Sequence, residues 1–426
     1  MTRIAVIGTG YVGLTTGACF AHMGHHVVCA DIDAQKVEGL RNGVLPFVEV
    51  GLQELVAEGL AGGRLSFVLG AANAAKDCEI AILCVPTPQG EDGSADLSFI
   101  EAAAREIGPA LPYEAVVVNK STVPVGSAKA VERVMGRPDV TVVSNPEFLR
   151  EGSAVQDFMR PDRIVIGADD QATALKVSSL YDTISAPVII TDPASAETIK
   201  YAANAFLATK LSFINAIAAI CERVGADVSD VVVGMGSDKR IGQDFLRPGP
   251  GWGGSSFGKD TRALLKIAHD AGYHFDLLDG VIAVNEEQFD RVAEKITSMA
   301  GGDLNGKTIA VWGLAFKART DDLRESPSPA IIRRLLAAGA TVRAYDPTVS
   351  AARPGIPSEI SIAESAVDAC AGADVLAVLT EWDEFRWLDV AAVKAAMTGR
   401  AVVDARNLLE RNQWRAAGFD YQGIGR

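Results

Sequence analysis

Short apolar runs alternate with amphipathic stretches through the first half of the chain. The run Arg3-Ile4-Ala5-Val6-Ile7 is typical of a buried strand, and strands are also predicted at 26–30, 65–68, 80–85, 115–119, 140–143, 164–166 and 188–190. Helical stretches separate several of these runs. This alternation predicts an α/β fold with a doubly wound parallel sheet covered by helices on both faces.

A helical period continues without Gly or Pro from Ala196 to about Val224. A helix of this length is predicted to link two domains and to offer a seam for a dimer. Lys200 and Asn204 lie four residues apart, so they share one face of it. On spacing alone, a solvated lysine near a helix start is the simpler interpretation of Lys200.

The last third of the chain repeats the first in outline. Residues 308–313 match 3–8, and residues 339–346 match 24–31 and also end in Asp. The distance from glycine to acid is 33 residues instead of 23, and the extra ten lie within residues 314–328. We expect a second doubly wound domain that has lost the glycine loop of the first.

The first glycine loop carries a strong signal for a dinucleotide. Gly8-Thr9-Gly10-Tyr11-Val12-Gly13 follows a strand and opens a helix, and the next strand ends at Asp31. Gly8 allows the turn, Gly10 lets the backbone approach a diphosphate, and Gly13 lets the helix pack closely. Asp31 would bind the ribose hydroxyls and repel a 2′-phosphate, which favours NAD over NADP. Lys36 could touch the ribose, although a solvated helix residue is the simpler interpretation.

Composition narrows the class of protein. The 426 residues are 48% hydrophobic and 22% charged, with a formal net charge of −14, which disfavours nucleic acid and anionic membranes as partners. We see no apolar run of the roughly 18 residues that a membrane span needs and no signal peptide, so a cytoplasmic protein is expected. The six cysteines lack metal-binding spacing, so no metal site is predicted.

The stretch Arg247 to Asp260 combines many glycines with a charged pair, Lys259-Asp260. The helical run from Thr261 to Ala268 comes next, which would place both charges at a helix N-terminus suited to an anionic ligand. An ordinary glycine-rich connection explains the composition equally well. Polar loops at 86–88, 121–126 and 145–152 come after predicted strands, where doubly wound sheets bind ligands.

Ordered motifs along the whole chain resemble the UDP-glucose/GDP-mannose dehydrogenase family. They are GTGYVG, CVPTP, STVPVG, NPEFLREG, KYAANAF, PGPGWGGS with FGKD, WGLAFK and DARN. The resemblance implies two Rossmann-like domains joined by a long dimerising helix, and oxidation of a nucleotide-linked hexose with NAD. It implies an NAD-binding domain at 1–195, a helical dimerisation region at 196–300 and a domain that binds the nucleotide sugar at 301–426.

The resemblance also implies roles for individual residues. Lys200, Asn204 and a water held by Asp260 would stabilise an alkoxide, Glu147 would act as a base, and Thr122 would position a hydrolytic water. The residues implied for cofactor binding are Gly8, Gly10, Tyr11, Val12, Gly13, Asp31, Lys36, Pro86, Thr87, Thr122, Glu151 and Lys259. Those implied for binding a UDP-, GDP- or TDP-linked sugar are Phe148, Leu149, Arg150, Lys200, Asn204, Arg240, Phe245, Arg247, Gly253, Phe257, Lys317 and Arg406.

One catalytic position departs from the family pattern, because Ser256 stands where the motif has its nucleophilic cysteine. A thiol becomes a competent thiolate near a cation, whereas a serine hydroxyl needs an adjacent base. Gly258, in place of the usual Pro, and the segment 46–52 (PFVEVGL) also depart from the pattern. We therefore expect a single two-electron oxidation to a ketone or, less simply, an aldehyde.

Two other hypotheses stay open. The chain could be a four-electron 6-dehydrogenase whose cysteine was deliberately changed to serine, or a non-catalytic homologue that binds nucleotide sugars. Retention of Lys200, Asn204 and Asp260 argues against a mere binder, since binding needs no alkoxide site.

Overall fold

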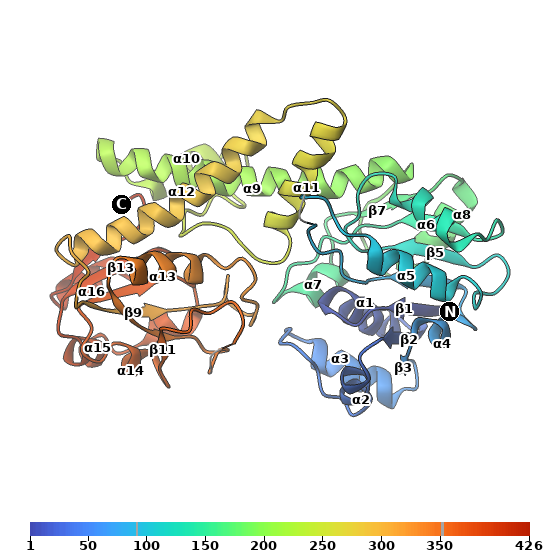
Figure 1. The fold of residues 1–426 in the computed structure, drawn as a ribbon, viewed down its shortest axis with the longest axis horizontal. Helices are drawn as coiled ribbons and strands as arrows, with labels where there is room; N and C mark the ends of the chain where they lie inside the picture. The colour runs from blue at the N-terminus through green and yellow to red at the C-terminus, as the bar shows by residue number, and fades with distance from the viewer. Residues whose placement is uncertain (91–92, 351–352) are drawn as a thin grey trace. The chain divides into compact units, whose positions relative to one another are not determined.

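The apolar runs of the first half form one eight-stranded sheet in the order β3-β2-β1-β4-β5-β6-β7-β8 (Figure 1). In this computed structural model, which describes residues 1–90, 93–350 and 353–426, the chain divides into two compact units. The first unit comprises Met1–Ala203 and Arg262–Tyr273, and the second comprises Asn204–Thr261 and His274–Arg426.

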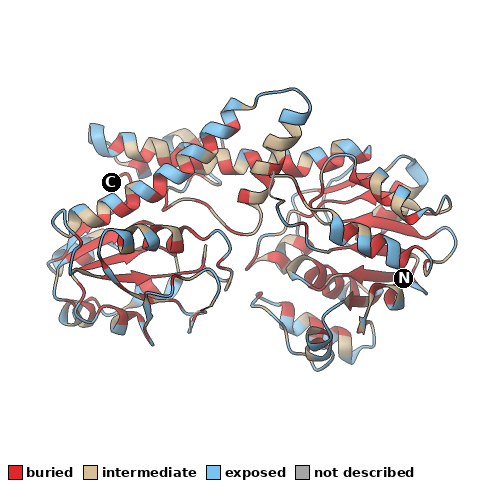
Figure 2. Ribbon diagram, in the orientation of Figure 1, coloured by how far each residue is buried: buried red, intermediate tan, exposed pale blue. Residues whose placement is uncertain are grey.

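Strands β1 to β6 of the first sheet run parallel, and their short apolar cores are buried by helices on both faces (Figure 2). The strands are β1 (Arg3–Ile7), β2 (His26–Asp31), β3 (Leu65–Leu69), β4 (Ile80–Leu83), β5 (Val116–Asn119), β6 (Thr141–Ser144), β7 (Ile164–Gly167) and β8 (Val188–Thr191). The helices are α1 (Tyr11–His22), α2 (Ala34–Arg41), α3 (Leu52–Ala61), α4 (Ala71–Ala75), α5 (Ser98–Ile107), α6 (Ser127–Met135), α7 (Ala154–Met159) and α8 (Gln171–Ser178).

The prediction of a wholly parallel first sheet is wrong at one edge. Strand β7 pairs antiparallel with β6, and β8 then runs parallel to β7. The connection from β6 to β7 contains only the six-residue helix α7, about 9 Å long. Such a short helix does not carry the chain back along the sheet as the crossover of a parallel pair must.

The second sheet has the strand order β11-β10-β9-β12-β13-β14, and all its pairings are parallel in the described residues. Its strands are β9 (Thr308–Trp312), β10 (Thr341–Tyr345), β11 (Ser361–Ile362), β12 (Val375–Val378), β13 (Ala401–Asp404) and β14 (Asp420–Gln422). Its helices are α12 (Asp276–Met299), α13 (Pro327–Ala337), α14 (Ala366–Ala369), α15 (Val390–Ala396) and α16 (Arg411–Ala416). The fold class predicted from the sequence is confirmed.

The internal repeat is visible in the backbone of the two sheets. Gly8 and Gly313 end the equivalent strands β1 and β9 with φ values of 99° and 97°. Their amides bond to Ala30 and Tyr345 at the ends of β2 and β10, both at 2.8 Å. The two halves therefore turn in the same way after their first strands, although the segments beyond the turn differ.

The long central helix, α9 (Pro193–Val224), begins in the first unit and continues into the second. Helix α10 (Val228–Gly236) lies in the second unit, whereas α11 (Phe257–Asp270) begins in the second unit and belongs to the first from Arg262 onward. By length and composition α9 could cross a membrane, with a mean hydropathy of 1.4 in its most apolar window. The sequence analysis considered only uninterrupted apolar runs and therefore did not single out this helix. Part of the apolar character is explained by packing, since Ile214, Ala218 and Cys221 lie in the core of the second unit.

Candidate active site

The glycine loop after β1 leaves open space in front of helix α1. A Cβ on Gly8 would lie 2.6 Å from the Cys84 carbonyl oxygen, and one on Gly13 would lie 1.9 Å from the Gly8 carbonyl oxygen. In the described residues, a Cβ on Gly10 would have no heavy atom within 4 Å, and no side chain caps the helix there. These features fit a diphosphate at the helix N-terminus. Tyr11 and Val12, both half-buried, form the first turn.

Asp31 closes β2 beside this loop. Its Oδ2 accepts hydrogen bonds from the Thr9 amide (3.0 Å) and hydroxyl (2.6 Å) and from Lys36 Nζ (3.1 Å). Oδ1 accepts a bond from the Asp33 amide at 3.1 Å. Burial acts to raise the pKa of Asp31, but the hydrogen bonds from Thr9, Asp33 and Lys36 outweigh it and hold the pKa below its usual value. Asp31 is thus an anion with acceptor capacity left on Oδ1, as ribose recognition requires.

Lys36 is an ion-pair partner of Asp31 with 28% of its side chain exposed, which differs from the solvated residue that we expected. Helix α2 begins at Ala34, capped by Asp33, and this turn brings Lys36 back over the strand end. The residues that fit the ribose end of NAD are therefore Asp31 with Lys36 beside it.

The loops after β4, β5 and β6 meet at the same edge of the first sheet. Thr87 Oγ1 donates to the Thr122 carbonyl oxygen at 2.9 Å and joins two of these loops, and both residues are buried. Pro86 is exposed, and Glu151 in the third loop is buried. Carboxyl ends of parallel strands are where such sheets bind ligands, so these residues are placed to line a cofactor site.

Lys200 forms a buried ion pair with Glu147. Its Nζ donates to the Glu147 carbonyl oxygen at 2.7 Å and to Oε1 at 3.0 Å, and both side chains are 5% exposed. Glu147 Oε2 accepts from the Leu149 amide at 2.6 Å, and Lys200 Nζ lies 5.5 Å from the centre of the Phe148 ring. The pair places an ammonium and a carboxylate together out of bulk water. Arg150 instead points to the surface and pairs with Asp157.

One turn after Lys200, helix α9 presents Asn204 to the start of α11. Asn204 Nδ2 donates to Asp260 Oδ2 at 2.6 Å, and Lys259 Nζ pairs with Oδ1 at 2.8 Å. Asp260 is fully buried. Helix α11 begins at Phe257, four residues before the predicted start, so Lys259 and Asp260 lie within its first turn.

The glycine-rich segment is held rigidly by amide side chains. The Gly249 amide donates to Asn215 at 2.8 Å, the Gly249 carbonyl accepts from Gln288 at 2.7 Å, and Asn285 bonds both the amide and the carbonyl of Trp252. Trp252 also donates its ring N–H to Ser212. A flexible connection would need none of these bonds.

Several glycines of this segment are required by the protein's own packing. A Cβ on Gly253 would lie 1.8 Å from the Glu325 carbonyl oxygen, and one on Gly254 would lie 2.7 Å from the Phe316 ring. Close approach to a ligand is therefore not needed to explain them. The segment packs on residues 316–325, which belong to the insertion of the second half.

Ser256 directly precedes α11, and its carbonyl accepts the Asp260 amide at 2.8 Å. Its hydroxyl makes no hydrogen bond with the residues that the structure describes. Phe257 is next in the chain and lies between Phe245 (ring centroids 6.3 Å apart) and Trp252 (6.2 Å). The three aromatic rings lie together beside the glycine-rich segment, and the role of Phe245 and Phe257 in bordering the sugar stays a prediction. Arg240 pairs with Asp238 and is 89% exposed, and Arg247 is also exposed.

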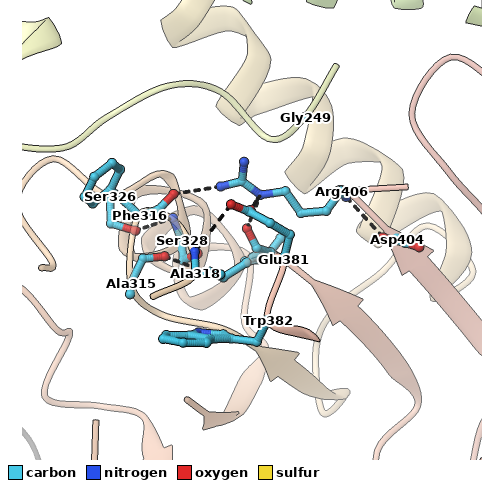
Figure 3. A network of polar contacts seen from close by, with 12 residues as sticks. Gly249, Ala315, Phe316, Ala318, Ser326, Ser328, Glu381, Trp382, Asp404 and Arg406 are labelled. Atoms are coloured by element: carbon cyan, nitrogen blue, oxygen red, sulfur yellow. Dashed lines mark hydrogen bonds and ion pairs between the residues drawn. The ribbon is translucent and has the colours of Figure 1, made fainter. Parts of the chain in front are cut away.

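Arg406, after β13, anchors a second polar cluster (Figure 3). Its Nε donates to the Leu379 carbonyl and its Nη2 to the Phe316 carbonyl, both at 2.8 Å. Glu381 Oε2 lies 3.0 Å from Nε, without the angle of a hydrogen bond. Nη1 makes no hydrogen bond within the described part of the chain and lies near Gly249. Arg406 can therefore present Nη1 to an anion, and Lys317 lies nearby in sequence with its Nζ 5.3 Å from the Phe316 ring.

Sequence reasoning missed the residues that support these groups. Asn119 and Glu197 lie beside Lys200, Asn285 and Gln288 hold the glycine-rich segment, and Asp346 holds the loop after β9. Of these residues, only Asp346 could have been singled out from the sequence, because it matches Asp31 in the internal repeat. The others are single polar residues within apolar helices or strands, where the sequence alone does not indicate their partners.

Three family models match the chain in succession. They are described as the NAD-binding domain (residues 2–185), the central domain (194–287) and the UDP-binding domain (310–411) of the UDP-glucose/GDP-mannose dehydrogenase family. The NAD-binding model coincides with the glycine loop and Asp31, so the predicted cofactor is confirmed.

Individual relatives are similar over their whole lengths. UDP-glucose 6-dehydrogenase TuaD of Bacillus subtilis is 46% identical over 432 residues, covering 100% of this chain and 94% of the relative. UDP-glucose 6-dehydrogenase of Rhizobium meliloti is also 46% identical, with coverages of 100% and 99%. The structure of a UDP-glucose dehydrogenase from Pyrobaculum islandicum matches with a TM-score of 0.92 at 37% identity, covering 100% of this chain and 98% of that one. From motifs, fold and these matches together, the chain belongs to the UDP-glucose/GDP-mannose dehydrogenase family of NAD-dependent nucleotide-sugar dehydrogenases.

Proposed function

We propose that this dehydrogenase removes one hydride from a hydroxyl-bearing carbon of a UDP-linked hexose and releases a carbonyl product. The observation that carries the proposal is Ser256, which the motif resemblance places where the family has its nucleophilic cysteine. A thiolate would add to an aldehyde intermediate and form a thiohemiacetal, from which a second hydride can leave on the way to an acid. Without a thiolate this second oxidation has no route.

The six cysteines of the chain offer no substitute nucleophile, since all of them are buried. Burial raises the pKa of Cys19, Cys78, Cys84 and Cys370 to about 12, and it also raises the pKa of Cys29. Cys221 lies in the apolar core of the second unit. Thiols in such surroundings stay protonated and inert.

The Lys200–Glu147 pair supports the first oxidation. A hydroxyl bound against this pair would give its proton to Glu147 Oε1 while the Lys200 ammonium stabilises the developing alkoxide. The C–H bond electrons then leave as hydride, which NAD accepts when bound, and the C–O bond becomes C=O. We assign Asn204 and Asp260, which are hydrogen-bonded to each other, to hold a water for the reaction, and Thr122 and Glu151 to border the cofactor.

Arg406 supports recognition of the nucleotide diphosphate, because its guanidinium is fixed by two carbonyls and still has Nη1 to offer. UDP is the nucleotide we propose, since the third family model is described as a UDP-binding domain. We assign Lys317 and Arg247 to the same anion, and Phe245, Phe257 and Gly253 to the sugar.

Counting NADH released per sugar tests the proposal. UDP-glucose and a panel of UDP-, GDP- and TDP-sugars are each converted to completion, and the product mass is measured. We expect one NADH and a carbonyl product. Ser256→Cys should raise the yield toward two NADH per sugar, whereas the matched control Ser255→Cys should not. Two NADH and a uronate from the unmodified protein would contradict the proposal.

A second candidate is complete four-electron oxidation to a uronate. It is favoured by the 46% identity to proteins named UDP-glucose 6-dehydrogenase and by the presence of Thr122 and Glu147, which would serve hydrolysis. It would require Ser256 to act as the nucleophile, although its hydroxyl has no hydrogen-bonded base among the described residues. The same NADH count decides between the two.

We also propose that two copies of the chain associate through α9. Phe206, Phe213 and Ile220 recur every seven residues and are 64%, 48% and 51% exposed. An apolar stripe of this kind on a long helix suits a symmetric helix–helix seam. Sedimentation should show a dimer for the unmodified protein, and Phe213→Asp should shift it toward the monomer.

A further inference from the structure

A small cavity lies in the first unit at the carboxyl ends of β5 and β6, beside Lys200. It has room for roughly one water molecule. Six of the eight residues around it have polar side chains, and the eight come from two segments, 119–123 and 144–146, and from α9. The lining residues are Asn119, Ser121, Thr122, Val123, Ser144, Pro146, Glu197 and Lys200.

Asn119, the last residue of β5, lines this cavity with a side-chain amide that lacks hydrogen-bond partners in the described residues. Its side chain is 1% exposed, and neither Oδ1 nor Nδ2 has a hydrogen-bond partner among the residues that the structure describes. Buried polar atoms in folded proteins almost always have partners, because an unsatisfied one loses its bonds to water without compensation. An amide in this state, on the wall of a cavity with room for one water and beside the charged groups of Lys200 and Glu197, favours a water in the cavity.

Lys200 also lines the cavity, and one of the three N–H groups of its ammonium has no acceptor among the hydrogen bonds described above. Its ammonium has three N–H donors, and two of them go to the carbonyl oxygen and Oε1 of Glu147. A buried ammonium is stable only when its charge is well solvated by its surroundings. A water in the cavity would supply the third acceptor.

Glu197, one turn before Lys200 on α9, holds the opposite wall in place. Its Oε1 accepts from the Ala128 amide (3.0 Å) and the Ser144 hydroxyl (2.9 Å), and its Oε2 accepts from the Gly126 amide (2.6 Å). Oε2 has capacity for one further donor. The carboxylate therefore fixes α9 against the loop that carries Thr122 and can accept a hydrogen from a water.

We propose that the cavity is an internal water site and that Asn119 is a positioning residue that holds this water against Lys200. The water accepts the third hydrogen of Lys200 Nζ and donates to Asn119 Oδ1 and Glu197 Oε2. It thereby fixes the direction of the ammonium toward Glu147 and the reacting oxygen. The kinetic part of this inference rests on the proposed role of Lys200, but the water site itself does not.

A crystal structure of the ligand-free protein, at a resolution that shows ordered waters, tests the site directly. We expect a water within hydrogen-bond distance of Asn119 and Lys200 in the unmodified protein, and none there in Asn119→Leu, which has a similar volume and no polar atoms. A dry cavity in the unmodified protein would overturn the proposal. Because no sugar is involved, this result is independent of how many hydrides the enzyme removes.

Kinetics test the positioning role. Asn119→Leu should lower kcat about tenfold, the scale of losing a supporting contact to a functional side chain, with the KM for NAD changed less than about twofold. Asn119→Ser keeps a polar partner for the water and should recover most of kcat. Thr16→Val, which removes another buried hydroxyl without a partner in the described chain but lies outside the cavity, is the matched control and should leave kcat unchanged. If Asn119→Leu matches the unmodified enzyme, or Asn119→Ser is equally impaired, Asn119 has no positioning role.

Discussion

The two sheets begin alike and bind different things, and their acidic residues show why. Asp31 and Asp346 occupy equivalent places after β2 and β10, but Asp31 keeps acceptor capacity on Oδ1, whereas Asp346 is saturated. Asp346 Oδ2 accepts from the Leu314 and Ala315 amides and the Trp382 ring, and Oδ1 accepts from the Thr348 amide and hydroxyl. The acid that we assign to ribose recognition in one half has a counterpart that holds a loop in the other.

The inserted residues replace, in the second half, the glycine loop and helix start that form the dinucleotide fingerprint of the first half. In the first half, α1 starts three residues after Gly8, so its N-terminus faces the ligand. In the second half, α13 starts only at Pro327, and the intervening loop is tied down by Asp346, Thr380 and Arg406. In our proposal, anion binding in the second half therefore depends on the Arg406 side chain instead of on helix amides.

Removing Lys200 is expected to have the largest effect and to separate chemistry from recognition. Lys200→Ala should lower kcat about 10³-fold, because it removes a cation that stabilises the transition state, with NAD affinity nearly unchanged. Arg406→Ala should instead raise the KM for the nucleotide sugar about tenfold with a smaller change in kcat. Steady-state kinetics and NAD titration measure both, and a loss confined to KM in Lys200→Ala would remove that residue from the chemistry.

Replacing Asp346 and Asp31 by asparagine tests whether the first acid holds a loop and the second binds the cofactor. Asp346→Asn should lower the free energy of unfolding by about 2–4 kcal/mol, because an amide group would face several N–H donors. Trp382 fluorescence reports on this site during denaturant unfolding. Asp31→Asn should cost less stability and should relax the preference for NAD over NADP. Equal losses in the free energy of unfolding from both substitutions would mean that Asp31 and Asp346 stabilise the fold to the same extent, which would contradict the comparison.

The glycines of the first loop offer a smaller and sharper test. Gly10→Ala should weaken NAD binding by about 1.4 kcal/mol, or tenfold, without changing the melting temperature, since its Cβ would meet only the space in front of the helix. Gly8→Ala is the matched comparison and should destabilise the fold, because its φ is 99° and its Cβ would press on the Cys84 carbonyl. Calorimetric titration with NAD and thermal unfolding separate the two effects. Unchanged NAD affinity in Gly10→Ala would place the diphosphate elsewhere.

The smallest expected effect is in the pH dependence of stability. The contributions of Asp404 and Asp31 to the free energy of unfolding should change with pH in opposite directions. Burial raises the pKa of Asp404, more than its hydrogen bonds to Leu409, Tyr421 and Arg406 lower it. Its contribution to stability is full below the pKa of the unfolded chain and is lost as pH rises through the folded pKa. The pKa of Asp31 is lowered, so its contribution is present above the unfolded pKa and is lost as pH falls. Unfolding of Asp404→Asn and Asp31→Asn against the unmodified protein over a pH series should show opposite trends.

The sequence determined the α/β class, the repeat, the dinucleotide loop and the membership of the family, because strand period, glycine position and ordered motifs are local properties of the chain. It misjudged the direction of β7 and the start of α11, since sheet pairing and burial depend on distant segments. Only the tertiary structure decided that Asp346 is consumed by its own loop, that the glycines near Ser256 pack on residues 316–325, and that Asn119 meets Lys200 at one cavity. Each of these depends on which partners the folded chain brings within a few ångströms, and no spacing along the sequence specifies that.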